Sequence, residues 1–569
     1  MRSIATLLLL ASLIVGQSVP SHAYTFQFNS AGTVQVKWPT RTINIALSSS
    51  LTAPQSHIKP GSDVVGAARR ALAHWADAAN LSFVIQQDSV AQTIGQDRIS
   101  LITVAPENAG QFNNPTRPGR SRIFFDPNTG AVTEADLAIN PNVARFDPFT
   151  GGLVGSSFST DGTPGTYDLE STFAHEIGHM LGLEHSAVVG ATMQPRQGFN
   201  GTYDLPAQTP RTLSEDDRAG IRALYNTQRG TGAIQGTVTY TNGPAVFGAH
   251  VWAEELSTGR VMAGNITPRT GAYRIENLFP GQYRVVTEYL NEPVSPTEIA
   301  SSGNGAYTGL STTSSAPFVV SETGASVGAD ATTSLPIVVN SSTPFLNPNF
   351  IGRNGQLSTV AVPLVPGERT SILIGGDNVF SATSVSTNSP FITVNSVQSQ
   401  SFGTLQVLFV DVSVSGVAPQ GDYDVRLSNG SEVAYISGGL TVDLPNGTTA
   451  ASGNPIDDAQ FFVAQHYRDF LNREPDAAGL GFWTNQITEC GSDPACRDIR
   501  RVNVSAAFFL SIEFQQTGYL VYRIHKTAFG NLPGKPVPVT FQEFLPETQQ
   551  IGRGVVVGAT GWEGQLEAN

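Results

Sequence analysis

Hydrophobic positions recur with two different periods along this chain. A strand-like alternation over residues 42–47 is followed by a helical repeat, whose apolar positions are Val64, Ala67, Ala68, Ala71, Leu72 and Trp75. Ser62 or Asp63 can cap this helix at its amino end. Further strand-like segments occupy residues 81–85, 99–104, 122–126 and 132–139, and the turn Pro127-Asn128-Thr129-Gly130 joins the last two as a hairpin. The pattern predicts short strands around one long amphipathic helix.

The period changes once more toward the carboxyl end. Short alternating runs separated by glycine and proline turns fill residues 233–340 and 341–445, which predicts two β-sandwich modules. Residues 446–455 are small and polar, as expected of a flexible linker. From residue 456 the period is nearly four, so residues 456–569 are predicted to form an all-α domain. The sequence ends within a further helical repeat, so a truncated chain stays an open alternative. Its core is predicted at Phe462, Tyr467, Phe470, Leu471, Leu480 and Trp483.

The amino-terminal residues 1–23 have the pattern of a secretory signal. Arg2 precedes an apolar run over residues 4–15, and Ser21 and Ala23 are the small residues that a signal peptidase reads. The apolar run is shorter than the roughly 20 residues that a membrane span needs, although an anchoring helix remains the alternative. We therefore expect a secreted, extracellular protein that begins near Tyr24.

The net charge and the hydrophobicity of the chain limit the kinds of partner that it can bind. The net charge of −14 argues against nucleic acid or an anionic membrane surface as a partner. No later segment is apolar enough for a membrane span. The only two cysteines, Cys490 and Cys496, lie close together in an exported chain, and we predict that they form a disulfide.

The most specific chemistry lies in the pattern H-E-x-x-H-x-x-G-x-x-H. His175 and His179 are four residues apart, so on a helix both imidazoles can bind one metal ion. Glu176 would sit beside the metal as general base. Gly182 permits a left-handed turn that lets His185 approach as third ligand. Three neutral histidines with a fourth position open are typical of a catalytic zinc site.

This segment resembles the active site of the metzincin zinc endopeptidases, specifically the matrixins (the matrix-metalloproteinase-like group). Ser186 follows the third histidine as in matrixins, Met193 matches the turn that underlies the metal, and residues 213–225 resemble the closing helix. The resemblance implies an α+β metalloprotease domain over residues 24–228, with the long helix packed on a mixed, mostly parallel sheet. It also implies that strand 122–126 is the sheet edge along which an extended substrate adds its backbone.

Some positions depart from the matrixin pattern. Pro195 stands where other metzincin branches carry a tyrosine, so a fifth protein ligand is not expected. No cysteine precedes Cys490, which excludes a cysteine switch, and no histidine between His74 and His175 could hold a second zinc. Residues 194–199 replace the usual specificity segment, so substrate preference does not transfer. Calcium stays open as a second cofactor, because its candidate ligands are equally ordinary hairpin residues: Asp126, Asn128, Glu134 and Asp136.

The modules after the motif resemble domains without recognisable catalytic groups. Residues 233–340 resemble the carboxypeptidase-regulatory-like β-sandwich, residues 341–445 an immunoglobulin-like sandwich, and residues 456–569 a helical domain of unknown function. We predict a secreted zinc endopeptidase of protein or peptide substrates, which the β modules attach to a cell-surface or matrix polymer. The alternative is an extracellular adhesion protein with an accessory or inactive protease-like domain. The intact Glu176, which is not a ligand, favours the enzyme.

Overall fold

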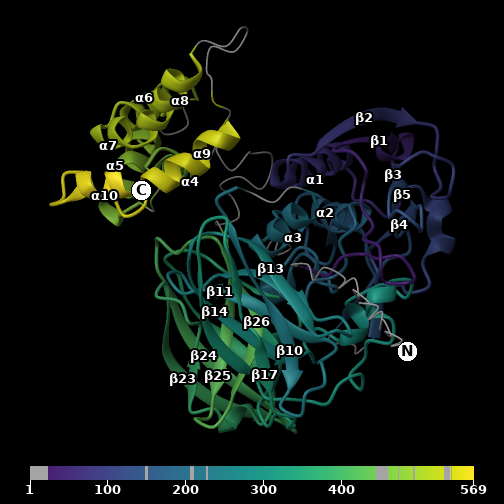
Figure 1. Ribbon diagram of the computed structural model, residues 1–569. Helices are drawn as coiled ribbons and strands as arrows, with labels where there is room; N and C mark the ends of the chain where they lie inside the picture. The colour runs from purple at the N-terminus through teal and green to yellow at the C-terminus, as the bar shows by residue number, and fades with distance from the viewer. Residues whose placement is uncertain are drawn as a thin grey trace, which may run out of the picture.

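The protein is multidomain, with a mixed α/β part, two β-sheet parts and a helical carboxyl-terminal part (Figure 1). We call these parts the first domain (residues 24–225), the second domain (229–340), the third domain (341–443) and the helical region (459–569). The computed structural model describes all residues except 1–23, 148–151, 206–210, 226–228, 444–458, 472, 474, 491–493, 531–538, 540 and 556. The predicted signal segment and linker therefore lie outside the described residues.

A five-stranded sheet with the order β2-β1-β3-β5-β4 forms one layer of the first domain. Its pairs are parallel except for β4–β5, which form the predicted antiparallel hairpin and leave β4 at the edge. These strands are β1 (Thr42–Ser48), β2 (Ser82–Ser89), β3 (Leu101–Thr103), β4 (Gly119–Phe125) and β5 (Val132–Ile139). Four short strands follow: β6 (Ala144–Asp147), β7 (Gly152–Gly155), β8 (Phe158–Ser159) and β9 (Tyr167–Asp168).

Three helices complete the first domain: α1 (Val64–Ala79), α2 (Leu169–Met180) and α3 (Glu215–Tyr225). Helix α1 begins at the predicted position, because the Asp63 carboxylate accepts the Gly66 N–H. Its apolar face is buried, and Trp75 Nε1 donates to the carbonyl oxygen of Ala174 in α2 at 2.8 Å. This contact holds the helix of the histidine motif against the long helix.

Two four-stranded sheets enclose the core of the second domain, with the orders β13-β10-β16 (β17 also pairs with β10) and β12-β11-β14-β15. The strands are β10 (Gly232–Tyr240), β11 (Ala249–Glu255), β12 (Val261–Ile266), β13 (Ala272–Leu278), β14 (Gly281–Tyr289), β15 (Ser321–Val327), β16 (Thr332–Ser334) and β17 (Ile337–Val339). Between β14 and β15 runs a long segment, residues 290–315, which we call the bridging loop. It contains the short helical turns η4 (Pro296–Glu298) and η5 (Gly305–Tyr307).

The third domain also has two sheets, with the orders β19-β18-β21-β24-β23 and β20-β26-β25-β22. The strands are β18 (Asn347–Arg353), β19 (Gln356–Ser358), β20 (Val362–Leu364), β21 (Arg369–Asp377), β22 (Ser384–Ser386), β23 (Ile392–Phe402), β24 (Leu405–Val414), β25 (Gly421–Ser428) and β26 (Val433–Val442). Bridging-loop residues Leu290, Val294 and Ile299 are buried in the same hydrophobic cluster as the core of this domain. The second domain therefore shares a hydrophobic core with the third domain through the bridging loop.

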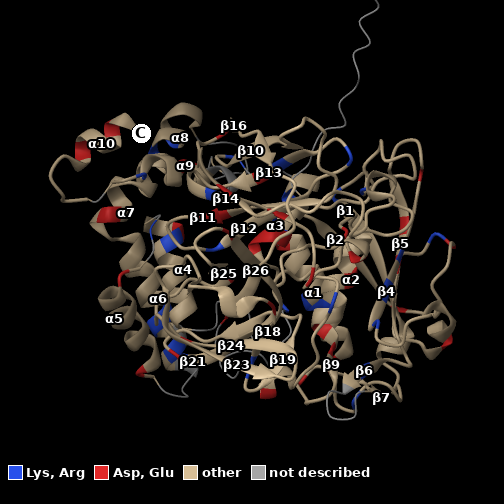
Figure 2. Cartoon of the chain, turned by 90° about the horizontal axis from the view of Figure 1, so that it is seen from below, with Lys and Arg blue, Asp and Glu red and all other residues tan. Residues whose placement is uncertain are grey.

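The first three domains meet around Trp252 of β11, which is fully buried. Its cluster contains Val188 and Ala191 of the first domain and Tyr435 of the third. Polar contacts cross the same junction: Trp252 Nε1 donates to Asp424 Oδ2 at 2.8 Å, and the Gly264 N–H of β12 donates to Asp216 Oδ1 of α3 at 2.6 Å. Acidic residues of α3 accordingly lie next to β12 (Figure 2). These contacts join the three domains into one packed body.

The helical region has a core of its own. Its helices are α4 (Ala459–Leu471), α5 (Ala477–Thr488), α6 (Pro494–Phe509), α7 (Ile512–Gln516), α8 (Gly518–Phe529), α9 (Phe541–Ile551) and α10 (Trp562–Ala568). The predicted core residues Phe462, Tyr467 and Leu480 are buried, with Phe470, Leu471 and Trp483 packed against them. The helical region and the first domain lie on different sides of the β domains (Figure 2). None of the described helices is long and apolar enough to cross a bilayer.

Candidate metal centre and active site

Helix α2 presents the first two histidines of the motif. The Asp168 carboxylate caps it by accepting the Ser171 N–H at 2.9 Å, and Arg211 Nη2 holds that carboxylate at 2.7 Å. The helix ends at Met180, and Gly182 follows with a φ of 102°. A Cβ at Gly182 would lie 2.3 Å from the carbonyl oxygen of Val36, so only glycine fits this turn. The turn brings His185 back toward α2.

The three histidines converge. One nitrogen from each of His175, His179 and His185 lies within 4.8 Å of the others, and all three side chains are half-buried. Among the described residues this is the only group of three or more histidine, cysteine or carboxylate side chains with such spacing. The structure thus brings together the three predicted ligands.

The hydrogen bonds of these imidazoles fit a cation at their centre. His175 Nδ1 donates to the carbonyl oxygen of Thr192 and His179 Nδ1 to that of Leu183, both at 2.8 Å. His185 Nδ1 likewise donates to the carbonyl oxygen of Glu298. With each proton on Nδ1, the Nε2 atoms present lone pairs, and those of His179 and His185 approach to 3.2 Å. Two facing lone pairs at this distance repel unless a cation binds both.

Burial keeps the ligands in the form that a metal requires. Desolvation lowers the pKa of His179 well below its ordinary value and that of His185 to about 3, so both are neutral at physiological pH. Neutral imidazoles without a cysteine nearby suit zinc in a three-histidine site. The residues present therefore fit the metal that the motif implies.

Glu176 lies beside the histidines and is 6 % exposed. Ser121 Oγ of the edge strand β4 lies 2.9 Å from Glu176 Oε2 and 2.8 Å from its carbonyl oxygen. A Cβ on Gly119 would approach Glu176 Cγ to 2.7 Å, so β4 needs glycine there. Burial raises the pKa of the Glu176 carboxyl, which makes it a better proton acceptor when ionised.

Met193 forms the floor of the site. It is fully buried, and its Sδ would lie 2.3 Å from a Cβ at Gly178, which sits in α2 between the first two histidines. The methionine therefore packs directly under the helix.

The first domain matches the family model for Matrixin over residues 37–226. Residues 37–226 form a matrixin domain. Behind it, residues 233–300 match the carboxypeptidase regulatory-like domain, and residues 449–517 match a domain of unknown function. The first two assignments agree with the resemblances inferred from the sequence.

Curated relatives match this chain through the matrixin domain. The hatching enzyme of Paracentrotus lividus is 33 % identical over 32 % of this chain and 25 % of the relative. Metalloendoproteinase 4-MMP of Arabidopsis thaliana is 27 % identical over 33 % of this chain and 48 % of the relative. The matches thus span a quarter to a half of these relatives' lengths. Among solved structures, the major pilin subunit of Bacillus cereus is similar over 37 % of this chain and 67 % of its own, at 12 % identity and a TM-score of 0.14.

Helix α3 of the matrixin domain supports the Met193 turn, a role that the motif alone did not reveal. Asp217 accepts the backbone N–H groups of Thr192 and Met193 at 2.7 and 3.2 Å. The same carboxylate accepts the hydroxyl of Tyr24 at 3.1 Å. Since Thr192 also orients His175, Asp217 acts on the metal site through the backbone. In the sequence, this role is indicated by the adjacent carboxylates Asp216 and Asp217 in the segment that resembles the closing helix.

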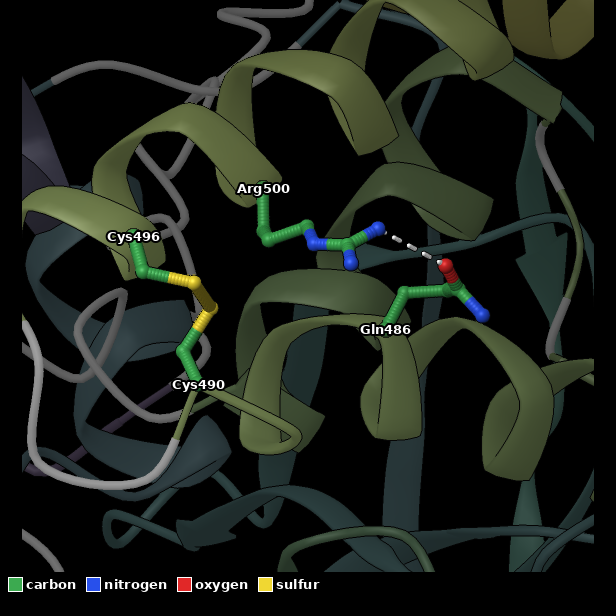
Figure 3. Close-up of a disulfide and its surroundings, with 4 residues drawn as sticks. All are labelled: Gln486, Cys490, Cys496 and Arg500. Atoms are coloured by element: carbon green, nitrogen blue, oxygen red, sulfur yellow. Dashed lines mark hydrogen bonds between the residues drawn. A yellow bond between two sulfur atoms is a disulfide. The ribbon is translucent and has the colours of Figure 1, made fainter.

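The remaining candidates lie away from the histidines. Glu134 accepts the backbone N–H groups of Asp97 and Arg98, and Asp136 those of Gly95 and Leu101. These carboxylates thus anchor the segment before β3, and the calcium site stays a prediction. A disulfide joins Cys490 and Cys496 between α5 and α6 (Figure 3).

Proposed function

We propose that this chain is a secreted zinc endopeptidase in which Glu176 is the general base. The observation that carries the proposal is the convergence of three Nε2 lone pairs next to a buried carboxylate. His175, His179 and His185 would hold the metal. Zinc bound in this way supplies Lewis acidity, which acidifies water and polarises a carbonyl group.

The residues around the metal suit the hydrolysis of a peptide bond. Glu176 takes a proton from the attacking water and passes it to the nitrogen of the leaving amine as the carbon–nitrogen bond breaks. Ser121 donates to one carboxylate oxygen and keeps the other directed to the water. Strand β4, at the edge of the sheet, pairs with an extended substrate and places its carbonyl next to Glu176.

Replacing the general base tests this assignment. We expect Glu176→Ala to bind zinc as the wild type does but to digest casein or gelatin about 10²- to 10⁴-fold more slowly. The matched control is Glu107→Ala, an exposed glutamate of the same domain, which should keep full activity. Phenanthroline should abolish the wild-type activity and added zinc should restore it. Undiminished proteolysis by Glu176→Ala would refute the role of this residue, and chelator-insensitive or absent cleavage would favour the adhesion-protein alternative.

The proposal also includes the export of the chain and its attachment to a polymer through the β modules. Removal of residues 1–23 would release a chain that begins at Tyr24, which sequencing of the secreted protein's amino terminus checks. The sandwich at residues 341–445 is proposed to be immunoglobulin-like. Its binding to a cell-surface or matrix polymer stays a prediction.

A further inference from the structure

The bridging loop of the second domain lies directly on the third histidine of the matrixin domain. The His185 backbone N–H donates to the carbonyl oxygen of Ile299 at 3.0 Å. The carbonyl oxygen of the preceding residue, Glu298, accepts the proton on His185 Nδ1. One short turn of the second domain thus contacts both the backbone and the imidazole of this residue.

The other two histidines are oriented differently. His175 Nδ1 donates to Thr192 and His179 Nδ1 to Leu183, and both acceptors belong to the matrixin domain itself. The acceptor for His185 lies 113 residues further along the chain. Because the Nδ1 hydrogen bond sets the tautomer and the ring plane, it determines where the Nε2 lone pair points. Two ligands are therefore fixed within the domain, whereas the third depends on its neighbour.

The turn that carries Glu298 is held to the matrixin domain by an ion pair. Arg196, three residues after Met193, donates from Nε and Nη2 to the two oxygens of Glu298 at 2.9 and 2.8 Å. Glu298 also completes a capping box with Ser295, which stiffens the turn. A bidentate pair of this kind fixes direction as well as distance.

A second attachment lies on the other side of the histidine. Glu184, the residue before His185, is buried, and its carboxylate accepts the backbone N–H and the hydroxyl of Ser301 at 3.1 and 2.8 Å. Asn304 Nδ2 donates to the same carboxylate at 3.1 Å and to the carbonyl oxygen of Phe26 at 2.8 Å. The bridging loop is therefore attached to the matrixin domain at the residue whose carbonyl orients His185 and again a few residues after it.

We propose that the bridging loop is a positioning element of the metal site, so that the carboxypeptidase regulatory-like domain completes the zinc centre of the matrixin domain. The inference rests on the proposed function only in taking zinc as the metal. It assigns Glu298 and Ser301 as positioning residues, which act through the backbone carbonyl that accepts the His185 proton. Zinc affinity, and not catalysis alone, then depends on the second domain.

The test measures zinc affinity on the full chain, by competition with a chromophoric chelator. Glu298→Ala removes the ion pair with Arg196 and should weaken zinc binding about tenfold, and Glu298→Ala with Ser301→Ala should approach a hundredfold loss, the range typical of groups that orient metal ligands. Glu298→Gln keeps the volume and removes only the charge, so a smaller loss in the same direction is expected. If the double variant does not fold, the zinc affinity of Glu298→Gln tests the inference instead.

Thr297→Ala is the matched control, because Thr297 is in the same turn but is exposed and pairs with Ser295 instead of the matrixin domain. It should bind zinc like the wild type. The absorption spectrum of the Co²⁺-substituted protein is a second readout, and it should change in the Glu298 variants but not in Thr297→Ala. Wild-type zinc affinity in folded Glu298→Ala and double variants would overturn the inference. A wild type that binds zinc tightly but cleaves no peptide would instead refute the proposed activity and leave this inference standing.

Discussion

The β domains and the helical region are attached to the rest of the protein in different ways. At the junction of the first three domains, Trp252 is fully buried and donates a hydrogen bond to Asp424 of another domain. The helical region instead encloses a separate core, against which Val417 of the third domain packs while only partly buried. Large apolar side chains such as Leu510 and Ile512 remain exposed on it, at 69 % and 73 %.

This difference predicts which parts unfold together. Domains joined by buried apolar surface and buried hydrogen bonds lose those interactions when either partner opens, and therefore unfold cooperatively. Domains that meet through small, partly exposed contacts melt separately. We expect the matrixin domain and both β domains to behave as one unit, and the helical region as another.

The largest effect should come from removing the side chain at the junction. Trp252→Ala leaves a cavity among three domains and removes one of the hydrogen bonds that Asp424 accepts, so the free energy of unfolding of the three-domain unit should fall by about 3–5 kcal/mol. Urea denaturation, followed by zinc release and by tryptophan fluorescence, checks this value. Phe482→Ala is the matched control, since this aromatic residue is 56 % exposed in the helical region and its loss should cost less than about 0.5 kcal/mol. Separate unfolding transitions of the first and second domains in the wild-type protein would contradict the prediction that they unfold as one unit.

A smaller effect should appear as pH rises. Burial, together with the negative charge of Asp217 nearby, raises the pKa of Asp216 to about 7 and that of Asp422 to about 8. Both values exceed the ordinary pKa of 3.8, so the folded state holds more protons, and its stability falls as pH increases toward 8. The slope is at most about 1.4 kcal/mol per pH unit for each carboxyl.

Asp422→Asn separates this contribution from the others. Asparagine keeps the acceptor for Thr441 Oγ1, which lies 2.8 Å from Asp422 Oδ1, but it cannot ionise. Melting temperatures measured between pH 5 and 8 should therefore fall less steeply in this variant than in the wild type. An unchanged slope would mean that Asp422 does not titrate at the junction.

The smallest effect concerns the disulfide between Cys490 and Cys496. It closes a short loop between two helices of the helical region, and its reduction should lower the stability of that region by about 2 kcal/mol. Calorimetry with and without reductant should show a shift in the helical transition alone. Chelator-sensitive peptidase activity should not change, whereas a shift of the main transition would contradict the separation of the two units.

Much of the matrixin domain could be predicted because its signals are local. The 3.6-residue period of α1, the cap at Asp63 and the spacing of His175, Glu176 and His179 all follow from residues within one or two helical turns. Gly182 was also predictable, since a turn directly after a helix favours the left-handed conformation that glycine adopts.

The contacts between domains could not be predicted in this way. The acceptor of His185 Nδ1 is a backbone carbonyl, which every residue has, so Glu298 leaves no signature in the sequence. Trp252 is one of several apolar residues on an alternating strand, and the pattern does not indicate which of them faces another domain. Segments far apart in sequence, which the pattern predicts as separate modules, therefore proved to be parts of the same packed body.

The bridging loop also bears on how the protein changed by descent. The likeness to the carboxypeptidase regulatory-like family ends at residue 300, between Ile299, which accepts the His185 N–H, and Ser301, which binds Glu184. The limit of the family match and the limit of the contacts with the matrixin domain thus fall at different places in the chain. A division of the chain at the family limit would separate β15, β16 and β17 from the sheets that they complete, and it would leave behind half of the attachment to the histidine. Substitutions in this loop are consequently exposed to selection on an active site in another domain.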